Sequence, residues 1–266
     1  MNKVALAVVA HPDDIEFRMA GTLLLLGQSG WELHCLNVGS GNCGSQTLAS
    51  AQARRVRRAE AQTAARLLGA RWHPALSDDL EILYELPLLR RLAAVIREIK
   101  PSVVLTHPPR DYMEDHTNTC RLTVTAVFAR GMPNFVTIPR RPIFSGDTVL
   151  YHCTPHGLTD SLRHPMRPEF YVNTSSVHAR KLEALAAHAS QREWLMASQG
   201  FDAMTAYVEK ESRQLGRWSG KFRYAEGWWR HSHLGFGAED ADPLRDALGA
   251  NYRLNQGRAA RSSNPF

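Results

Sequence analysis

The chain has 266 residues, which is enough for one large α/β domain or for two small domains. Hydrophobic residues make up 44% of it and charged residues 22%, a balance typical of a globular protein rather than of a disordered or membrane-spanning one. Lys and Arg number 32 against 26 Asp and Glu, and much of this excess lies in residues 54–58 and in the C-terminal tail. Such positions are typical of a helix face and a solvated end, so we expect no nucleic-acid partner.

The cysteines and the N-terminus indicate the compartment. The four cysteines form no Cys-x-x-Cys pair, which argues against a thiolate zinc site and against a disulfide framework. The N-terminus shows no signal-peptide pattern, and the longest apolar segment, around residues 23–26, is far too short to span a bilayer. We therefore expect a cytoplasmic protein with no membrane partner. The sequence leaves a homo-oligomer open.

The first half of the chain alternates strand and helix patterns. Strands are predicted over 3–9, 31–38, 71–76 and 102–106, and helices over 17–28, 46–68, 86–100 and 115–129. A Gly-rich turn, residues 39–44, follows the second strand. Strands that alternate with helices predict an α/β fold with a mostly parallel sheet covered by helices on both faces.

The second half is less regular. A Pro- and Arg-rich loop over 134–147 precedes strands predicted at 148–153 and 169–173, and helices follow over 177–197 and 203–215. We find no linker and no internal repeat. The sequence predicts one domain over residues 1–254, in which these later strands and helices are appended to the sheet, and a disordered polar tail over 255–266.

The first predicted strand ends in one imidazole and two adjacent carboxylates, His11, Asp13 and Asp14. Sites in open α/β sheets form just beyond the carboxyl ends of strands. His and Asp are zinc ligands, and a neighbouring carboxylate can take up a proton. The pattern therefore indicates metal-assisted hydrolysis, with His11 and Asp14 as candidate ligands. Asp13 is either a catalytic carboxylate or the N-cap of the next helix.

A catalytic zinc commonly has three protein ligands and one position for water, so a third ligand should follow another strand. The strand predicted at 102–106 leads into a loop with two histidines. His116, at the start of the next helix, is the better candidate, and His107 is the weaker competitor. A lone histidine after a strand is more often structural, but its pairing with the first motif favours ligation.

These residues resemble the signature of the LmbE/PIG-L family of zinc-dependent N-deacetylases. The resemblance covers residues from about 3 to 230 in order. It rests on Ala-His-Pro-Asp-Asp at 10–14, Arg-x-x-Glu at 57–60, the block at 111–116, Lys181 with His-Ala-Ser-Gln at 188–191, and Ala-Glu at 225–226.

The resemblance implies a Rossmann-like α/β fold and an enzyme that removes an acetyl group from an N-acetylated amino sugar or sugar conjugate. It implies one Zn²⁺ per chain, held by His11, Asp14 and His116, with another divalent metal as an alternative. Water activated by the metal would attack the amide carbonyl, and Asp13 would accept its proton as the general base.

The chain departs from the family pattern beside the third ligand. Some relatives carry a histidine three residues before it that polarises the carbonyl, and this chain has Met113 there. The alternative groups are an imidazole from elsewhere in the chain, or the side chain of a tyrosine or arginine. The candidates for substrate contact are Arg57, Asp79, Tyr112, His156 and His188, and His152 is a further imidazole.

Several of these candidates also have an ordinary structural interpretation. Arg57 is spaced to form an ion pair with Glu60, Asp79 is suited to cap a turn, and His188 is suited to hold loops by hydrogen bonding. Tryptophans 218, 228 and 229 are better explained as core residues than as a surface for sugar stacking.

Two other functions fit the same sequence. One is an amidase that acts on a thiol-sugar conjugate or another small amide, and the other is a non-catalytic Rossmann module that binds a sugar or nucleotide. Metal content separates the binding module from the two hydrolases, because a binding module holds no stoichiometric metal. The substitution Asp13→Ala separates them too, because it abolishes turnover only in a hydrolase.

Overall fold

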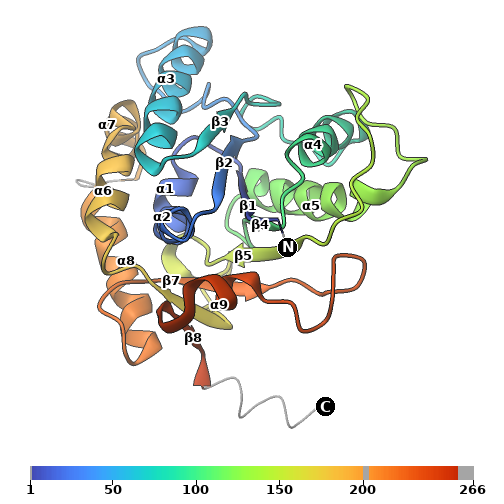
Figure 1. Ribbon diagram of the computed structural model, residues 1–266. Coiled ribbons are helices and arrows are strands. Elements are labelled where there is room, and N and C mark those ends of the chain that lie inside the picture. Colours follow the sequence, from blue (N-terminus) through green and yellow to red (C-terminus); the bar gives the residue numbers. More distant parts are fainter. Residues whose placement is uncertain (1, 200–203, 257–266) are drawn as a thin grey trace.

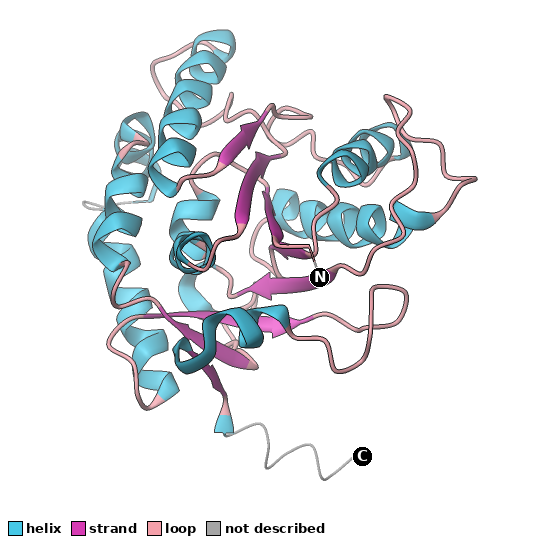
Figure 2. Cartoon of the chain, viewed as in Figure 1, coloured by secondary structure: helices cyan, strands magenta, loops and turns pink. Residues whose placement is uncertain are grey.

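The computed structural model describes residues 2–199 and 204–256, and its centre is a twisted sheet (Figures 1 and 2). The strands are β1 (Val4–Val9), β2 (Glu32–Asn37), β3 (Arg71–His73), β4 (Val103–Thr106), β5 (Val149–Cys153), β6 (Phe170–Asn173), β7 (Ala225–Arg230) and β8 (Tyr252–Leu254). Within the described residues they form one sheet in the order β3-β2-β1-β4-β5-β7-β6-β8.

The sheet has a parallel half and an antiparallel half. Strands β3, β2, β1, β4 and β5 pair in parallel, whereas β7 is antiparallel to both β5 and β6, and β8 is antiparallel to β6. The expected α/β fold, with a parallel sheet and later elements appended to it, is confirmed.

Helices cover both faces of the sheet. Within the described residues they are α1 (Asp14–Arg18), α2 (Ala20–Gln28), α3 (Ser50–Leu68), α4 (Leu86–Ile99), α5 (Glu114–Phe128), α6 (His178–Ala186), α7 (Ala189–Gln199), α8 (Met204–Ser219) and α9 (Pro243–Leu248). Figure 1 shows α3 and α6 on one side of the sheet and α4 and α5 on the other.

Strand β1 is apolar throughout because it supplies both cores. Ala5, Ala7 and Val9 pack with α2 and the end of α3, while Leu6 and Val8 pack with α4 and α5. Successive side chains of a strand point to opposite faces, so a strand buried on both faces needs a continuous apolar run. This burial fixes the position at which the chain leaves the sheet after Val9.

Two predicted helices are interrupted in the structure. The helix predicted at 17–28 is divided at Met19, and α2 starts again where the Glu226 carboxylate accepts the backbone N–H groups of Gly21 and Thr22. The helix predicted at 177–197 is divided between α6 and α7, next to His188, which bonds to Glu16. In both places a side chain distant in sequence determines the boundary.

Other boundaries also differ from the prediction. The helix predicted at 46–68 begins only at Ser50, and β7, α9 and β8 were not predicted. Strand β7 contains Glu226 and Gly227, which interrupt the apolar pattern that would predict a strand. Its Trp228 is fully buried, in agreement with its interpretation as a core residue. Of the predicted tail, residues 257–266 lie outside the described residues, as does residue 203 of the last predicted helix.

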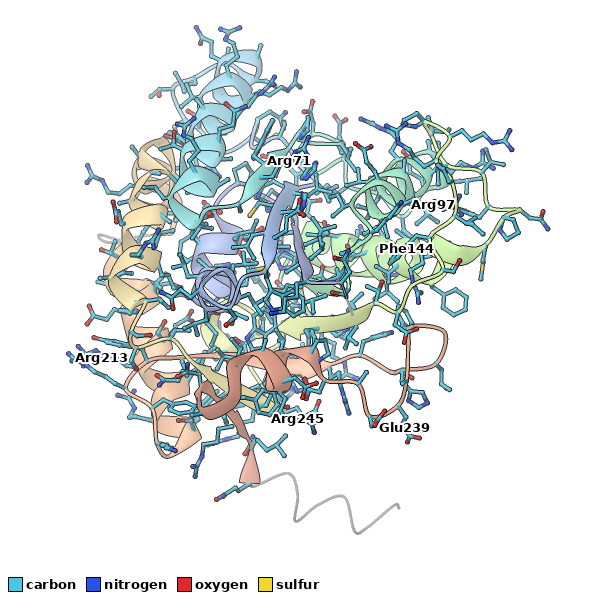
Figure 3. The ribbon with its side chains drawn as sticks, in the orientation of Figure 1. Arg71, Arg97, Phe144, Arg213, Glu239 and Arg245 are labelled. Carbon is cyan, nitrogen blue, oxygen red and sulfur yellow. The ribbon has the colours of Figure 1, made fainter. Side chains whose placement is uncertain are left out.

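Charged side chains lie mainly around the periphery. Figure 3 shows Arg213, Arg245 and Glu239 at the outside of the molecule, on α8, on α9 and on the loop before α9. None of the helices formed by the described residues is both long enough and apolar enough to cross a membrane.

Candidate active site

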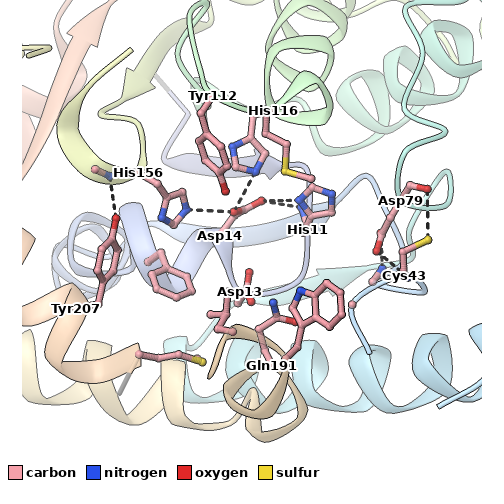
Figure 4. A pocket seen from close by; sticks show the side chains of 18 of the residues that line it. His11, Asp13, Asp14, Cys43, Asp79, Tyr112, His116, His156, Gln191 and Tyr207 are labelled. Atoms are coloured by element: carbon pink, nitrogen blue, oxygen red, sulfur yellow. Dashed lines mark hydrogen bonds and ion pairs between the residues drawn. The ribbon is translucent and has the colours of Figure 1, made fainter. Parts of the chain in front are cut away.

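A cleft opens at the carboxyl end of β1. The order of the strands reverses at this point, because the chain continues from β1 to β2 on one side and reaches β4 on the other. Such a reversal leaves a crevice at the sheet edge, where ligands of open α/β sheets bind. The cleft has a volume of about 640 Å³, within the usual range for sites of small molecules (Figure 4).

His11, Asp14 and His116 converge in this cleft. One ligand atom from each lies within 4.8 Å of the others. The Asp14 carboxylate is central, with Oδ2 at 3.6 Å from His11 Nδ1 and Oδ1 at 3.5 Å from His116 Nε2. Asp14 is held in place because its Oδ2 also accepts the backbone N–H of His11 at 2.7 Å. The loop after β1 and the first turn of α5 thus bring together residues about a hundred positions apart.

Two further carboxylates orient the imidazoles. His11 Nε2 lies 2.9 Å from Asp115 Oδ2, and His116 Nδ1 lies 3.0 Å from Asp111 Oδ1. A carboxylate accepts the ring N–H, so the other nitrogen of each neutral imidazole keeps its lone pair and faces Asp14. This donor set fits a divalent metal ion such as zinc, which binds His nitrogen and Asp oxygen.

The electrostatics of the site favour positive charge. Burial lowers the pKa of His11, but its hydrogen bonds to Asp115 and Asp14 outweigh burial and raise that pKa to about 10. For Asp14 the effect of burial is to raise the pKa, but the His116 and His107 imidazoles outweigh burial and hold this pKa well below its ordinary value. A cation placed among these carboxylates would therefore be stabilised.

His107 has a different environment from His116. Its Nε2 accepts the backbone N–H of Ala10 at 2.9 Å, so that lone pair is already used. Its ring stacks on that of His116, with centroids 4.1 Å apart and planes inclined by 8°. A second group of candidate donors, His107, Asp111 and His116, is therefore less suited to a metal than the first. The geometry favours His116 over His107 as a third ligand.

Asp13 occupies the N-cap position of α1, but its side chain makes no capping hydrogen bond. Its backbone has φ 104°, a left-handed conformation that is strained for a residue with a side chain. The carboxylate lines the cleft and is buried. Burial raises the pKa of Asp13, and the Arg57 guanidinium opposes that shift. A capping role therefore does not explain Asp13.

Arg57 contacts the motif more closely than it contacts Glu60. Its Nη2 donates to the carbonyl of Pro12 and lies 3.2 Å from Asp13 Oδ2, whereas its Nη1 is 3.9 Å from Glu60 Oε2. Glu60 instead accepts hydrogen bonds from the backbone N–H and the hydroxyl of Ser190. The buried guanidinium therefore positions the loop that carries Asp13.

The other predicted contact residues differ in how they face the cleft. Tyr112 and His156 line it, and Tyr112 is exposed. Asp79 also lines it, but both carboxylate oxygens accept backbone N–H groups, from Gly41 at 2.7 Å and Cys43 at 3.1 Å. Asp79 therefore holds the Gly-rich turn. His188 is buried against Glu16 and is not among the residues that line the cleft.

Sequence reasoning missed the two orienting carboxylates. Asp111 and Asp115 flank Tyr112, Met113 and Glu114 in one acidic block, and that block directly precedes His116. Its acidic character was a usable signal, because a metal-ligating histidine usually donates its second ring N–H to a carboxylate or carbonyl. Which acid serves which histidine follows only from the fold, since Asp115 bonds to His11 rather than to its neighbour.

Comparison with known proteins agrees with this architecture. Residues 6–127, which include the residues that converge on Asp14, match the family described as PIG-L, GlcNAc-PI de-N-acetylase. The match places a PIG-L (LmbE-like) family domain at residues 6–127 of the chain. The expected resemblance is thereby confirmed for the part of the chain that runs from β1 to the end of α5.

The chain is similar to two kinds of enzyme. Diacetylchitobiose deacetylase of Thermococcus kodakarensis is 28% identical over 232 residues, which cover 85% of this chain and 82% of that one. A 4-oxalmesaconate hydratase of Pseudomonas putida is 28% identical over 197 residues, covering 71% and 74%. The structure of N,N′-diacetylchitobiose deacetylase from Pyrococcus horikoshii aligns with a TM-score of 0.71 and 23% identity, covering 91% and 88%, and shows the shared fold.

Proposed function

We propose that this protein is a metal-dependent hydrolase that removes the acetyl group from an N-acetylated amino sugar or sugar conjugate. The observation that carries the proposal is that the imidazoles of His11 and His116, each oriented by a carboxylate, converge on Asp14. The Asp13 carboxylate lies beside them and makes no helix-capping hydrogen bond. The diacetylchitobiose deacetylase among the relatives of the chain supports an acetamido substrate. The four cysteines are free thiols, which supports a reducing compartment such as the cytoplasm.

In this proposal His11, Asp14 and His116 hold one divalent cation, with zinc as the first choice. When bound, such a cation supplies Lewis-acid polarisation of the amide oxygen and makes water more acidic. Water adds to the carbonyl carbon as Asp13 takes one of its protons, and the carbonyl oxygen gains negative charge. When the C–N bond breaks, the departing nitrogen takes that proton from Asp13. Acetic acid, which ionises to acetate, and a free amine result.

The role of Asp13 is tested with Asp13→Asn, because an amide cannot accept the proton. We expect acetate release from N-acetylglucosamine or N,N′-diacetylchitobiose to fall by about 10² to 10⁴-fold while the metal content is unchanged. Elemental analysis of the same samples measures the metal. The substitution His116→Ala should instead remove the metal along with the activity. Asp240→Asn, at an exposed position, is the matched control.

The results separate the alternatives. Full turnover in Asp13→Asn would contradict the mechanism. Protein without stoichiometric metal that still binds a sugar or nucleotide would be a non-catalytic module. Turnover of a thiol-sugar amide without turnover of acetylated sugars would assign the same site to the amidase alternative.

A hydratase is the second candidate. One relative of similar identity is a hydratase, and the exposed Arg163 at the cleft offers a cation for a carboxylated substrate. Water addition to a double bond also needs an activated water and a base, so the Asp13 site fits both reactions. Loss of the ultraviolet absorbance of an unsaturated di- or tricarboxylate, with no acetate released from the sugar panel, would favour this candidate.

A further inference from the structure

A further histidine, His156, faces the candidate metal site from the opposite wall of the cleft. His156 begins η2 (His156–Leu158), just after β5, and its Nε2 lies 3.5 Å from Asp14 Oδ1 (Figure 4). It lies outside the compact group of ligand atoms formed by His11, Asp14 and His116. Met113, which also lines the cleft, offers a thioether and no N–H donor there.

The position of the proton on His156 follows from its neighbour. Arg18 Nη2 lies 3.1 Å from His156 Nδ1. A guanidinium only donates hydrogen bonds, so Nδ1 must accept and the ring proton of the neutral imidazole must lie on Nε2. Nε2–H is therefore an oriented donor at the wall of the cleft. Phe17 packs edge-on against the ring, with centroids 5.0 Å apart, and limits its rotation.

Arg18 is itself held by a buried network. It is 4% exposed, and its Nη2 donates to Glu211 Oε2 on α8. Glu211 Oε1 accepts the backbone N–H of Gly157 at 2.7 Å, and the Tyr207 hydroxyl accepts the same N–H at 2.8 Å. Glu211 thus joins the arginine to the backbone next to His156. Both partners of this ion pair are buried, and the pair holds the guanidinium beside His156.

We propose that His156 is a catalytic hydrogen-bond donor and that Arg18 and Glu211 are positioning residues that keep its Nε2–H directed at the reacting oxygen. The inference rests on the proposed function. As water adds to the amide, negative charge develops on the former carbonyl oxygen, and a preoriented N–H at that oxygen stabilises the charge. His156 transfers no proton in this step; Asp13 carries the proton from the water to the departing nitrogen.

The positioning claim is tested on metal-free protein labelled with ¹⁵N-histidine. Long-range ¹H–¹⁵N spectra report which ring nitrogen carries the proton, and His156→Gln assigns the His156 signals. We expect the Nε2–H tautomer in the wild type, a mixture of tautomers in Arg18→Met, and recovery in Arg18→Lys, because an ammonium also donates to Nδ1. Arg55→Met, at an exposed position of α3, is the control. An Nδ1–H tautomer in the wild type, or an unchanged one in Arg18→Met, would overturn this claim.

The catalytic claim is tested by kinetics together with metal analysis. We expect kcat for acetate release to fall by about 10² to 10³-fold in His156→Ala, with KM and metal content little changed. His156→Gln keeps an N–H near the position of Nε2 and should stay within about tenfold of the wild type. His233→Gln is the matched control, because His233 lies outside this cleft.

Four results would overturn the catalytic claim. Loss of metal from His156→Ala would make His156 a ligand, and an unchanged kcat would make it structural. A loss in Tyr112→Phe as large as that in His156→Ala would make the tyrosine hydroxyl the donor. If the wild type releases no acetate from any acetylated sugar, the proposed function itself fails and the catalytic claim fails with it. The tautomer spectra distinguish that outcome from a failure of the positioning claim.

Discussion

Gly41 shows how closely single residues are fitted around the loop that carries Asp13. It has φ +77°, and a Cβ added there would lie 2.8 Å from both Cβ and Nε of Arg57. We expect Gly41→Ala to lower the free energy of unfolding by about 2–4 kcal/mol, through left-handed strain and overpacking together. Deacetylation should fall as well, because Arg57 holds the loop that carries Asp13. Urea denaturation measures the first effect and acetate release the second.

Gly30 provides the comparison. It has φ +78°, but nothing lies within 4 Å of an added Cβ. Gly30→Ala should therefore show only the conformational strain, about 1–2 kcal/mol, with activity unchanged. Equal losses of stability in the two variants would mean that contact with Arg57 contributes nothing.

At the scale of secondary-structure elements, Glu226 joins three of them. Its Oε1 accepts the Gly21 N–H of α2 at 2.8 Å and the Lys181 ammonium of α6 at 2.7 Å, while β7 carries the carboxylate itself. We expect Lys181→Met to lower the free energy of unfolding by about 3–5 kcal/mol, because it leaves a buried carboxylate without its cation. Chemical denaturation of the variant measures this loss.

A double-mutant cycle tests whether the pair acts as a unit. Lys181→Met combined with Glu226→Gln should lose less than the sum of the two single losses. Arg213→Met removes the exposed ion pair with Glu209 on α8 and should leave the free energy of unfolding almost unchanged. Additive losses in the cycle would show that Lys181 acts through packing alone.

At the scale of the whole molecule, a buried histidine makes stability depend on pH. His178 stacks on Tyr224 with ring centroids 3.8 Å apart, and neither ring nitrogen has a hydrogen-bond partner among the described residues. Burial lowers its pKa from 6.5 to about 4. The unfolded chain therefore takes up the proton first as the pH falls. The contribution of neutral, buried His178 to folding stability is therefore complete above pH 6.5 and is lost progressively as the pH falls towards 4.

The substitution His178→Phe keeps a stacked ring and removes the titration. Between pH 7 and pH 5 we expect the variant to lose roughly 1–2 kcal/mol less stability than the wild type does. Denaturation curves at both pH values measure the difference, with His164→Gln on the surface as the control. An identical pH dependence in the variant and the wild type would show that the pKa of His178 is the same in the folded and unfolded states.

The fold was predictable where local pattern and tertiary structure agree. The apolar run of β1 and the strand–helix alternation up to α5 reflect a parallel sheet that is buried on both faces, so the pattern is strong. The antiparallel half was less predictable. In β7, the Glu226 carboxylate binds the start of α2 and the Lys181 side chain of α6, and its charge conceals the apolar pattern of the strand.

The sequence by itself determined that His11, Asp13 and Asp14 follow a buried strand, and it indicated His116 as their distant complement. Those inferences depend on residue type and on the short-range connection of strand to loop. Only the tertiary structure decided that Asp115 orients His11 and that Arg18 orients His156, across 104 and 138 residues of chain. Hydrogen bonds act over about 3 Å, and only the folded sheet brings such distant residues that close.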